Sequence, residues 1–164
     1  MEEINSLHNS FVMQLVEQAT KSYNQFSRGF EIIKTNVEEA ENLFQNVLKN
    51  NDYYLSSMEF YNDQFYGLDR SDELLYLGQL LSLQVKACRN LVVINRNKSI
   101  EGQALYYESR MNQYKEDLYF YNLLAKDLVK AGPILMMFTK DAHIEDSIIE
   151  KATLRYNEYI KKHQ

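Results

Sequence analysis

Apolar side chains recur every three or four residues through the first third of the chain, which is the spacing of one face of an α-helix. The stripe comprises Ile4, Leu7, Phe11, Leu15, Ala19, Tyr23, Phe26, Phe30 and Ile33. It continues over 37–48 without losing phase, although the segment 35–38 has the spacing of a capping box that starts a new helix. Because Gly29 also weakens a continuous helix, we predict a break near Lys34.

The middle of the chain contains its most apolar segment. Asn50-Asn51-Asp52 predicts an interruption, after which a helical stripe resumes and ends at the loop 67–71. From Leu74 to Ile94 the sequence is apolar on nearly every side of a helix. A helix of that kind must be enclosed by others, so we place it at the centre of a bundle.

The next segment has a heptad seam. We expect Ser99 to cap a helix that runs to Ala131 and is stopped by Gly132-Pro133. Its seam alternates spacings of four and three residues through Ile100, Ala104, Tyr107, Met111, Tyr114, Leu118, Tyr121, Ala125 and Leu128. This period is typical of coiled-coil-like packing against a long neighbour. A last amphipathic helix is expected from about Asp141 to Ile160.

These patterns predict an all-α fold. We expect an elongated helical bundle of four to six helices with coiled-coil-like packing, formed as a single domain by residues 1–164. The chain has only 5 glycines and 1 proline, too few for a β-protein with many tight turns.

Charge and composition narrow the choice of partners. There are 18 basic and 23 acidic side chains, a net charge of −5, and no Lys/Arg run longer than Lys161-Lys162, so we expect no nucleic acid. The charge-free stretch from Leu74 to Val85 is shorter than the roughly 20 residues of a membrane span. The first residues lack the pattern of a secretory signal. We therefore expect a cytoplasmic protein, with Cys88 as a small core residue.

The sequence contains no complete catalytic or metal-binding motif. His8, His143 and His163 lie far apart, and none belongs to the Glu-x-x-His pairs of a di-iron bundle. Gly-x-Ser-x-Gly and glycine-rich phosphate loops are also missing. We therefore predict no catalytic residue, no metal and no cofactor.

One pattern of acidic residues favours an enzymatic function as the alternative. Glu38 and Glu41 lie one helical turn apart, and Asp69, Asp72 and Glu73 lie at the start of the apolar helix. This arrangement resembles the all-α nucleotide pyrophosphatases of the MazG and dUTPase type. The resemblance implies carboxylates from two helices that hold Mg²⁺ during hydrolysis of a nucleoside triphosphate. The second helix departs from the family pattern, because Tyr76 stands where an acidic residue is expected.

Aromatic composition is the unusual feature of this chain, which has 13 tyrosines, 8 phenylalanines and no tryptophan. Helical tyrosine stripes commonly form the margin of a core, but neighbours such as Tyr106-Tyr107 diverge by about 100° and cannot both point inward. The Met-Met-Phe run at 136–138 would make a poor surface unless covered. Our contact candidates are Tyr53, Tyr54, Tyr106, Tyr119, Met137 and Phe138.

The function predicted from these observations is a non-catalytic helical protein-protein interaction module. It would serve as a structural, adaptor or chaperone-like component that binds a protein partner or self-associates. A third class, a sensor bundle with an aromatic-lined cavity between its helices, also stays open.

Overall fold

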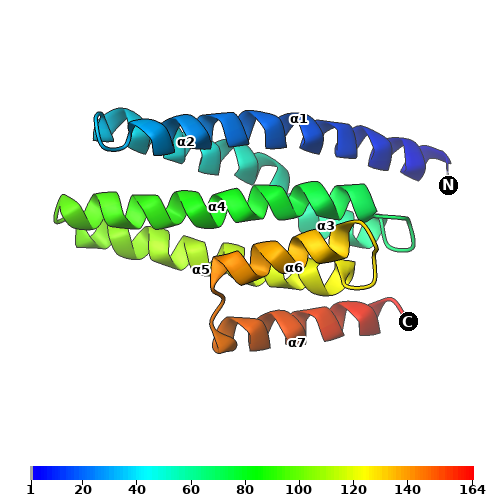
Figure 1. Ribbon diagram of the computed structural model, residues 1–164. Coiled ribbons are helices and arrows are strands. Elements are labelled where there is room, and N and C mark those ends of the chain that lie inside the picture. The colour runs from blue at the N-terminus through cyan, green and yellow to red at the C-terminus, as the bar shows by residue number, and fades with distance from the viewer. Residues whose placement is uncertain (1) are drawn as a thin grey trace.

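The computed structural model describes residues 2–164 and contains seven α-helices and no strand in that range. The helices are α1 (Glu2–Ile32), α2 (Val37–Leu55), α3 (Met58–Gln64), α4 (Ser71–Asn97), α5 (Glu101–Ala125), α6 (Ala131–Ala142) and α7 (Asp146–Lys162) (Figure 1). The predicted all-α helical bundle is therefore confirmed. Six of these helices are long enough to form the bundle, and α3 is a short seventh of 7 residues.

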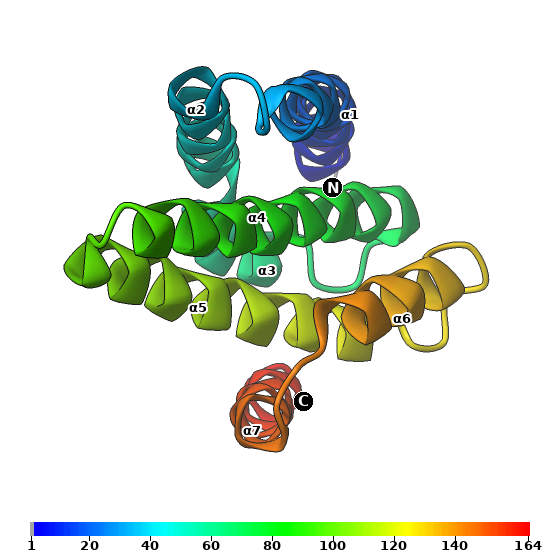
Figure 2. The same cartoon turned by 60° about the vertical axis from the view of Figure 1, so that its left-hand side comes forward.

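The helices form three layers. Figure 2 shows α4 and α5 side by side and running across the view, with α6 beside them, whereas α1 and α2 lie on one side of this layer and α7 on the other. The three outer helices are seen nearly end-on, so they cross the central ones steeply. Most residues of α4 are buried, which confirms its predicted position at the centre.

The predicted break after the first helix is confirmed. α1 ends at Ile32 and α2 begins at Val37, and the side chain of Asn36 accepts a hydrogen bond of 3.1 Å from the amide of Glu39. The cap therefore lies one residue later than the predicted capping box. Asparagine at this position satisfies an amide that has no partner within the helix.

The predicted interruption at Asn50-Asn51-Asp52 is wrong, because α2 continues to Leu55. Asn51 is fully buried and donates to Gln84 Oε1 at 2.9 Å. It also accepts from Gln18 Nε2 at 2.9 Å. The side chain of Asn51 thus meets partners on α1 and α4, so it packs inside the bundle and does not end the helix.

The buried face of α1 differs from the predicted stripe at two aromatic residues. Tyr23 and Phe30 are 63% and 62% exposed, whereas Ser22 and Gly29 are buried. The reason is the close approach of α2, because a Cβ atom on Gly29 would lie 3.0 Å from the ring of Phe44. Small residues occupy this contact, and the large aromatic side chains lie on the neighbouring face.

The loop predicted at 67–71 is confirmed. Gly67 has a φ of +89°, a conformation that L side chains rarely adopt. Asp69 Oδ1 accepts a hydrogen bond of 3.1 Å from the amide of Ser71, the first residue of α4. This bond satisfies one of the backbone amides at the start of α4, which have no acceptor within the helix.

Both predicted ends of the fifth helix are corrected. Ser99 does not cap α5; it has a left-handed φ of 61° and lies two residues before the helix begins. The helix ends at Ala125, and Gly132-Pro133 lies in the first turn of α6. Proline is accepted there because the first amides of a helix have no intrahelical acceptor.

The seam of α5 is buried at most of its predicted positions, namely Ala104, Tyr107, Tyr114, Leu118, Tyr121 and Ala125. Cys88 is fully buried, as expected for a core residue. Across residues 2–164, none of the helices combines the length and the apolar character that a membrane span requires.

Candidate functional site: an aromatic groove between α1, α4 and α6

An open groove of about 690 Å³ lies between α1, α4 and α6. Its lining combines five aromatic rings with hydroxyl and amide groups. The residues are Ala19, Thr20, Tyr23, Phe26, Ser27 and Phe30 of α1, Tyr76, Gln79, Ser82, Leu83 and Lys86 of α4, and Phe138 of α6. Binding sites commonly have this size and this mixture of apolar walls and few polar groups.

The aromatic side chains of α1 form one wall. Phe26 stacks on Phe30 with ring centroids 6.2 Å apart, and its other side packs on Phe44 of α2 at 5.4 Å. Phe26 is therefore anchored to the core, while Tyr23 and Phe30 stay largely exposed. Rigid aromatic side chains held in this way provide contact area at a low cost in conformational entropy.

The floor of the groove is one face of α4. Tyr76, Gln79, Leu83 and Lys86 follow one another at spacings of three, four and three residues, so they share a face of the helix. Tyr76, Gln79 and Lys86 are half-buried and Leu83 is buried, so this stripe lies below the two rims. It forms a continuous floor between α1 and α6.

The opposite rim depends on a close contact between α4 and α6. A Cβ atom on Gly78 would overlap the side chain of Leu135 and would lie 3.4 Å from the ring of Phe138. Only glycine allows α6 to approach α4 this closely. The contact places Phe138 at the edge of the groove.

The electrostatic character of the groove is simple. Among the described residues that line it, Lys86 alone is charged, and its side chain makes no ion pair with residues 2–164. Thr20, Ser27 and Ser82 add neutral hydroxyl groups. The groove is therefore an apolar surface with one positive charge in its floor.

The apolar surface of α1 extends beyond the groove. Met13, Val16, Thr20, Tyr23, Ser27 and Phe30 alternate spacings of three and four residues, and we call this set the α1 stripe. Met13 is 73% exposed at its far end. Seventeen residue steps in a helix span about 25 Å. The stripe is thus much longer than a small ligand.

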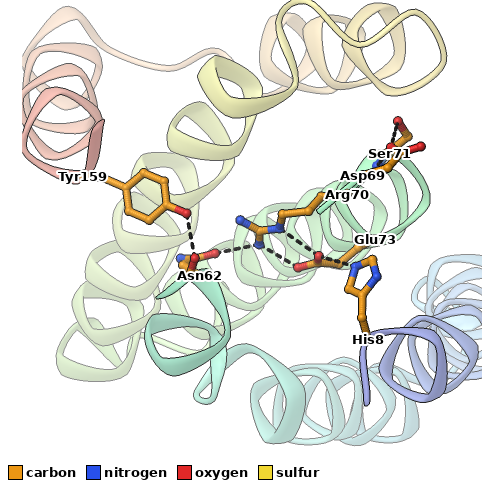
Figure 3. Close-up of polar contacts among 7 residues, drawn as sticks. All are labelled: His8, Asn62, Asp69, Arg70, Ser71, Glu73 and Tyr159. Atoms are coloured by element: carbon orange, nitrogen blue, oxygen red, sulfur yellow. Dashed lines mark hydrogen bonds and ion pairs between the residues drawn. The ribbon is translucent and has the colours of Figure 1, made fainter. Parts of the chain in front are cut away.

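A buried polar cluster holds the first half of α1 in place (Figure 3). His8 Nε2 lies 2.9 Å from Glu73 Oε1, and Arg70 donates to both oxygens of Glu73 at 2.8 and 2.7 Å. Arg70 also donates to Asn62 Oδ1 at 2.8 Å, and the Tyr159 hydroxyl donates to the Asn62 carbonyl at 2.6 Å. The cluster therefore connects α1, α3, α4 and α7.

The charges of this cluster are stabilised by one another. Burial alone would raise the pKa of Glu73, but hydrogen bonds from Arg70 and His8 outweigh it and leave that pKa below its ordinary value. Burial would lower the pKa of Arg70, but Glu73 outweighs it and raises that pKa. Since the partners are internal, we interpret the cluster as a structural anchor for α1.

A second buried cluster anchors the middle of α1. Gln18 donates to Ser22 at 3.0 Å, the Ser22 hydroxyl donates to Asn51, and Gln84 donates to the Leu48 carbonyl at 3.0 Å. Together with the cluster at His8, these bonds fix the course of α1 over α4. The residues that follow, 23–30, are thereby held as the wall of the groove.

The structure does not bring the six predicted contact residues together. Phe138 lines the groove, and Tyr54 and Tyr119 are partly buried against the core. The exposed candidates lie outside the groove lining: Tyr53 (74% exposed), Tyr106 (55%) and Met137 (52%). The expectation that one member of each tyrosine pair faces outward is confirmed, since Tyr107 is buried beside exposed Tyr106.

The sequence pattern does not single out the residues that line the groove. It places Tyr23, Phe26 and Phe30 on the apolar face of the first helix, uses Tyr76 only as a departure from the pyrophosphatase pattern and gives Lys86 no role. The available signal was the second stripe of α1, which runs beside the core stripe with the same heptad spacing.

The two acidic segments that resemble a pyrophosphatase metal site lie near opposite ends of α4. Glu41 pairs with Lys98, which follows the last residue of α4, at 2.8 Å. Glu73 lies near the other end of α4, 25 residues before Lys98. At the rise of an α-helix, this separation corresponds to roughly 37 Å along the helix axis. Within residues 2–164, no group of three or more His, Cys, Asp or Glu side chains is placed to hold a metal ion. The two acidic segments therefore do not form a joint Mg²⁺ site.

The chain matches no family model, no curated protein and no solved structure.

Proposed function

We propose that this chain is a non-catalytic interaction module that binds an amphipathic α-helix of a partner protein in the groove between α1, α4 and α6. The observation that carries the proposal is the exposed α1 stripe beside an open, aromatic-lined groove. A structural, adaptor or chaperone-like component would use such a surface. We also propose a cytoplasmic location, which suits a chain whose one cysteine is a buried free thiol.

A helix fits this surface better than a small molecule does. The α1 stripe repeats every 3.5 residues on average, and this is the period at which one helix contacts another along its length. The stripe extends over about 25 Å, whereas a small ligand would cover only the groove itself. An incoming helix would contact the α1 stripe on one side and Phe138 on the other.

The exposed side chains offer enough area to support binding. Burying one large apolar side chain contributes roughly 1.5–3 kcal/mol relative to leaving it in water. Tyr23, Phe30 and Met13 are each more than half exposed. Covering these three side chains would offset a large part of the entropy lost when two molecules associate.

A second copy of the chain is a poorer occupant than a different protein. An antiparallel pairing of two α1 stripes would place Met13 of one copy opposite Phe30 of the other. Because residue 13 faces residue 30 in this register, Glu17 faces Phe26 and Glu31 faces Val12 of the other copy, so no acidic side chains are brought opposite each other. Each copy carries a net charge of −5, however, and this overall repulsion between two copies disfavours self-association.

Site-specific photocrosslinking in cells that express the chain tests the proposal. A photoreactive phenylalanine analogue replaces Tyr23 in the groove, and Tyr53 serves as the matched control because it is at least as exposed but lies outside the groove. We expect position 23 to crosslink to a segment of another protein with an amphipathic helical pattern. Mass spectrometry of the crosslinked peptides identifies that segment.

Three results would contradict the proposal. Position 23 could give no adduct beyond those seen from position 53, or its adducts could map to segments without helical periodicity. Adducts to a second copy of this chain, together with a dimer in light scattering, would replace the partner protein by self-association.

A further inference from the structure

Lys86 places one positive charge in the floor of a groove whose other lining residues are neutral. Its side chain is half-buried between α1 and α6 and has no ion pair within residues 2–164. In the free protein, water solvates this ammonium group through the open side of the groove. That solvation ends when a helix covers the groove.

An ammonium group that loses its water without gaining a partner opposes binding strongly. A lysine at the margin of an interface can extend its ammonium group to the solvent. Lys86 is poorly placed for this, because α1 and Phe138 flank the floor on which it stands and the partner would cover the open side. The charge must therefore be compensated by the partner itself.

We infer that the partner helix carries a carboxylate, from Glu or Asp, within its apolar seam at the position that faces Lys86. This inference rests on the proposed function, because it concerns the helix that occupies the groove. One charged residue in an otherwise apolar seam fixes the register of two helices, since any shift leaves both charges buried without partners. Lys86 would thus select the partner and set its position along α1.

The other charges near the groove have a smaller effect on this choice. Glu17 and Glu31 are exposed on the outer edge of the α1 stripe. Water and salt screen charges in such positions, so they contribute little to the choice between partners. Lys86 is the charge that binding removes from water.

Selection from a displayed peptide library tests the inference. The library presents helices of about three heptads with apolar seam residues, and one seam position varies among Glu, Gln, Lys and Leu. The targets are the full chain and its variants Lys86→Glu and Lys86→Met. Binding of each enriched peptide is then measured by fluorescence anisotropy.

We expect the unmodified chain to favour Glu over Lys in the seam by about tenfold or more in affinity. Lys86→Glu should reverse this preference, and Lys86→Met should favour Leu. The variants Tyr23→Glu and Tyr53→Glu control for the site of binding. The first should abolish peptide binding, and the second should leave it unchanged.

The outcomes separate the inference from the proposed function. Peptides that bind in the groove with equal affinity for Glu, Gln and Lys would overturn the inference and leave the proposed function intact. If no helical peptide is enriched, or if the enriched peptides still bind Tyr23→Glu, both are overturned. Dodecanoate serves as an apolar carboxylate that is not a helix, and its Lys86-dependent binding without any enriched helix would assign the groove to a small ligand.

Discussion

His8 Nε2 lies 2.9 Å from Glu73 Oε1, although the two residues are 65 positions apart in the sequence (Figure 3). Glu73 is fully buried and also accepts two hydrogen bonds from Arg70. This contact joins the N-terminal helix to the start of the central helix. It therefore helps to determine the angle at which α1 crosses α4, and with it the shape of the groove.

Removing the negative charge of Glu73 should destabilise the protein strongly. In Glu73→Gln, the buried guanidinium of Arg70 loses its carboxylate, and breaking a buried ion pair in this way costs about 3–5 kcal/mol. Urea unfolding at neutral pH, followed by circular dichroism, measures this loss. Glu38→Gln is the control, because Glu38 is exposed and its replacement should change the free energy of unfolding by less than about 0.5 kcal/mol. Equal unfolding midpoints for the two variants would show that the cluster does not support the fold.

The stability of the protein should also fall in acid because of Glu73. Its pKa is lower in the folded state than in the unfolded chain, so the unfolded chain binds a proton at a higher pH. The stabilisation from this group is therefore fully present above its ordinary pKa of about 4.3 and is lost as the pH falls through the folded-state value. Urea unfolding from neutral pH down to about pH 3 should show a steeper loss for the unmodified chain than for Glu73→Gln. If the free energy of unfolding falls equally with pH in the unmodified chain and in Glu73→Gln, the acid sensitivity comes from other carboxylates.

The parts of the fold that sequence predicted correctly depend on local signals or on a strong pattern. The break between α1 and α2 is signalled by the capping-box spacing over 35–38, and the residue that caps α2 there is Asn36, which acts within one turn. The central place of α4 follows from apolar residues on every side. Such signals do not require knowledge of the neighbouring helices.

The incorrect predictions concern residues whose role depends on tertiary partners. Asn51 looked like a helix terminator, but it is a buried hydrogen-bonding residue between α1 and α4. Tyr23 and Phe30 looked like core residues because they are large and apolar. Only the approach of α2 shows that Ser22 and Gly29 occupy the core face and leave the aromatic rings free to line a groove.

Gly78 should be essential for the close packing of α6 on α4. An alanine Cβ at this position would overlap the side chain of Leu135, which is itself fully buried. Overpacking of this kind costs roughly 1–3 kcal/mol, so Gly78→Ala should lower the free energy of unfolding despite the better helix propensity of alanine. Thermal or urea unfolding measures the change.

Gly102 provides the matched control for Gly78. No atom lies within 4 Å of the Cβ that would be added at Gly102, in the first turn of α5. Gly102→Ala should therefore be neutral or should stabilise the protein by up to about 1 kcal/mol. If both alanine variants gain stability, α6 can move away from α4, and the position of Phe138 in the groove is not fixed by this contact.

Cys88 should be unreactive in the native protein. Its side chain is fully buried, and burial raises the pKa of its thiol to about 12. Because the thiolate is the reactive form, a disulfide reagent such as dithionitrobenzoate at about pH 8 should modify Cys88 only after unfolding in urea. The absorbance released per chain measures this reaction, with the denatured protein as the positive control. Rapid modification without denaturant would mean that the centre of the bundle opens readily.

The groove should bind an apolar aromatic anion even without a partner helix. Anilinonaphthalene sulfonate has fused rings that suit the wall formed by Phe26 and Phe30 and a sulfonate that suits Lys86. We expect a rise in its fluorescence on the native protein, and loss of that rise in Tyr23→Glu. The exposed position of Tyr23 means that this change should alter the free energy of unfolding by less than about 1 kcal/mol.

Tyr53→Glu is the matched control for dye binding. It should bind the dye like the unmodified chain, because Tyr53 lies outside the groove. Equal dye binding by both variants would place the accessible apolar surface elsewhere on the molecule.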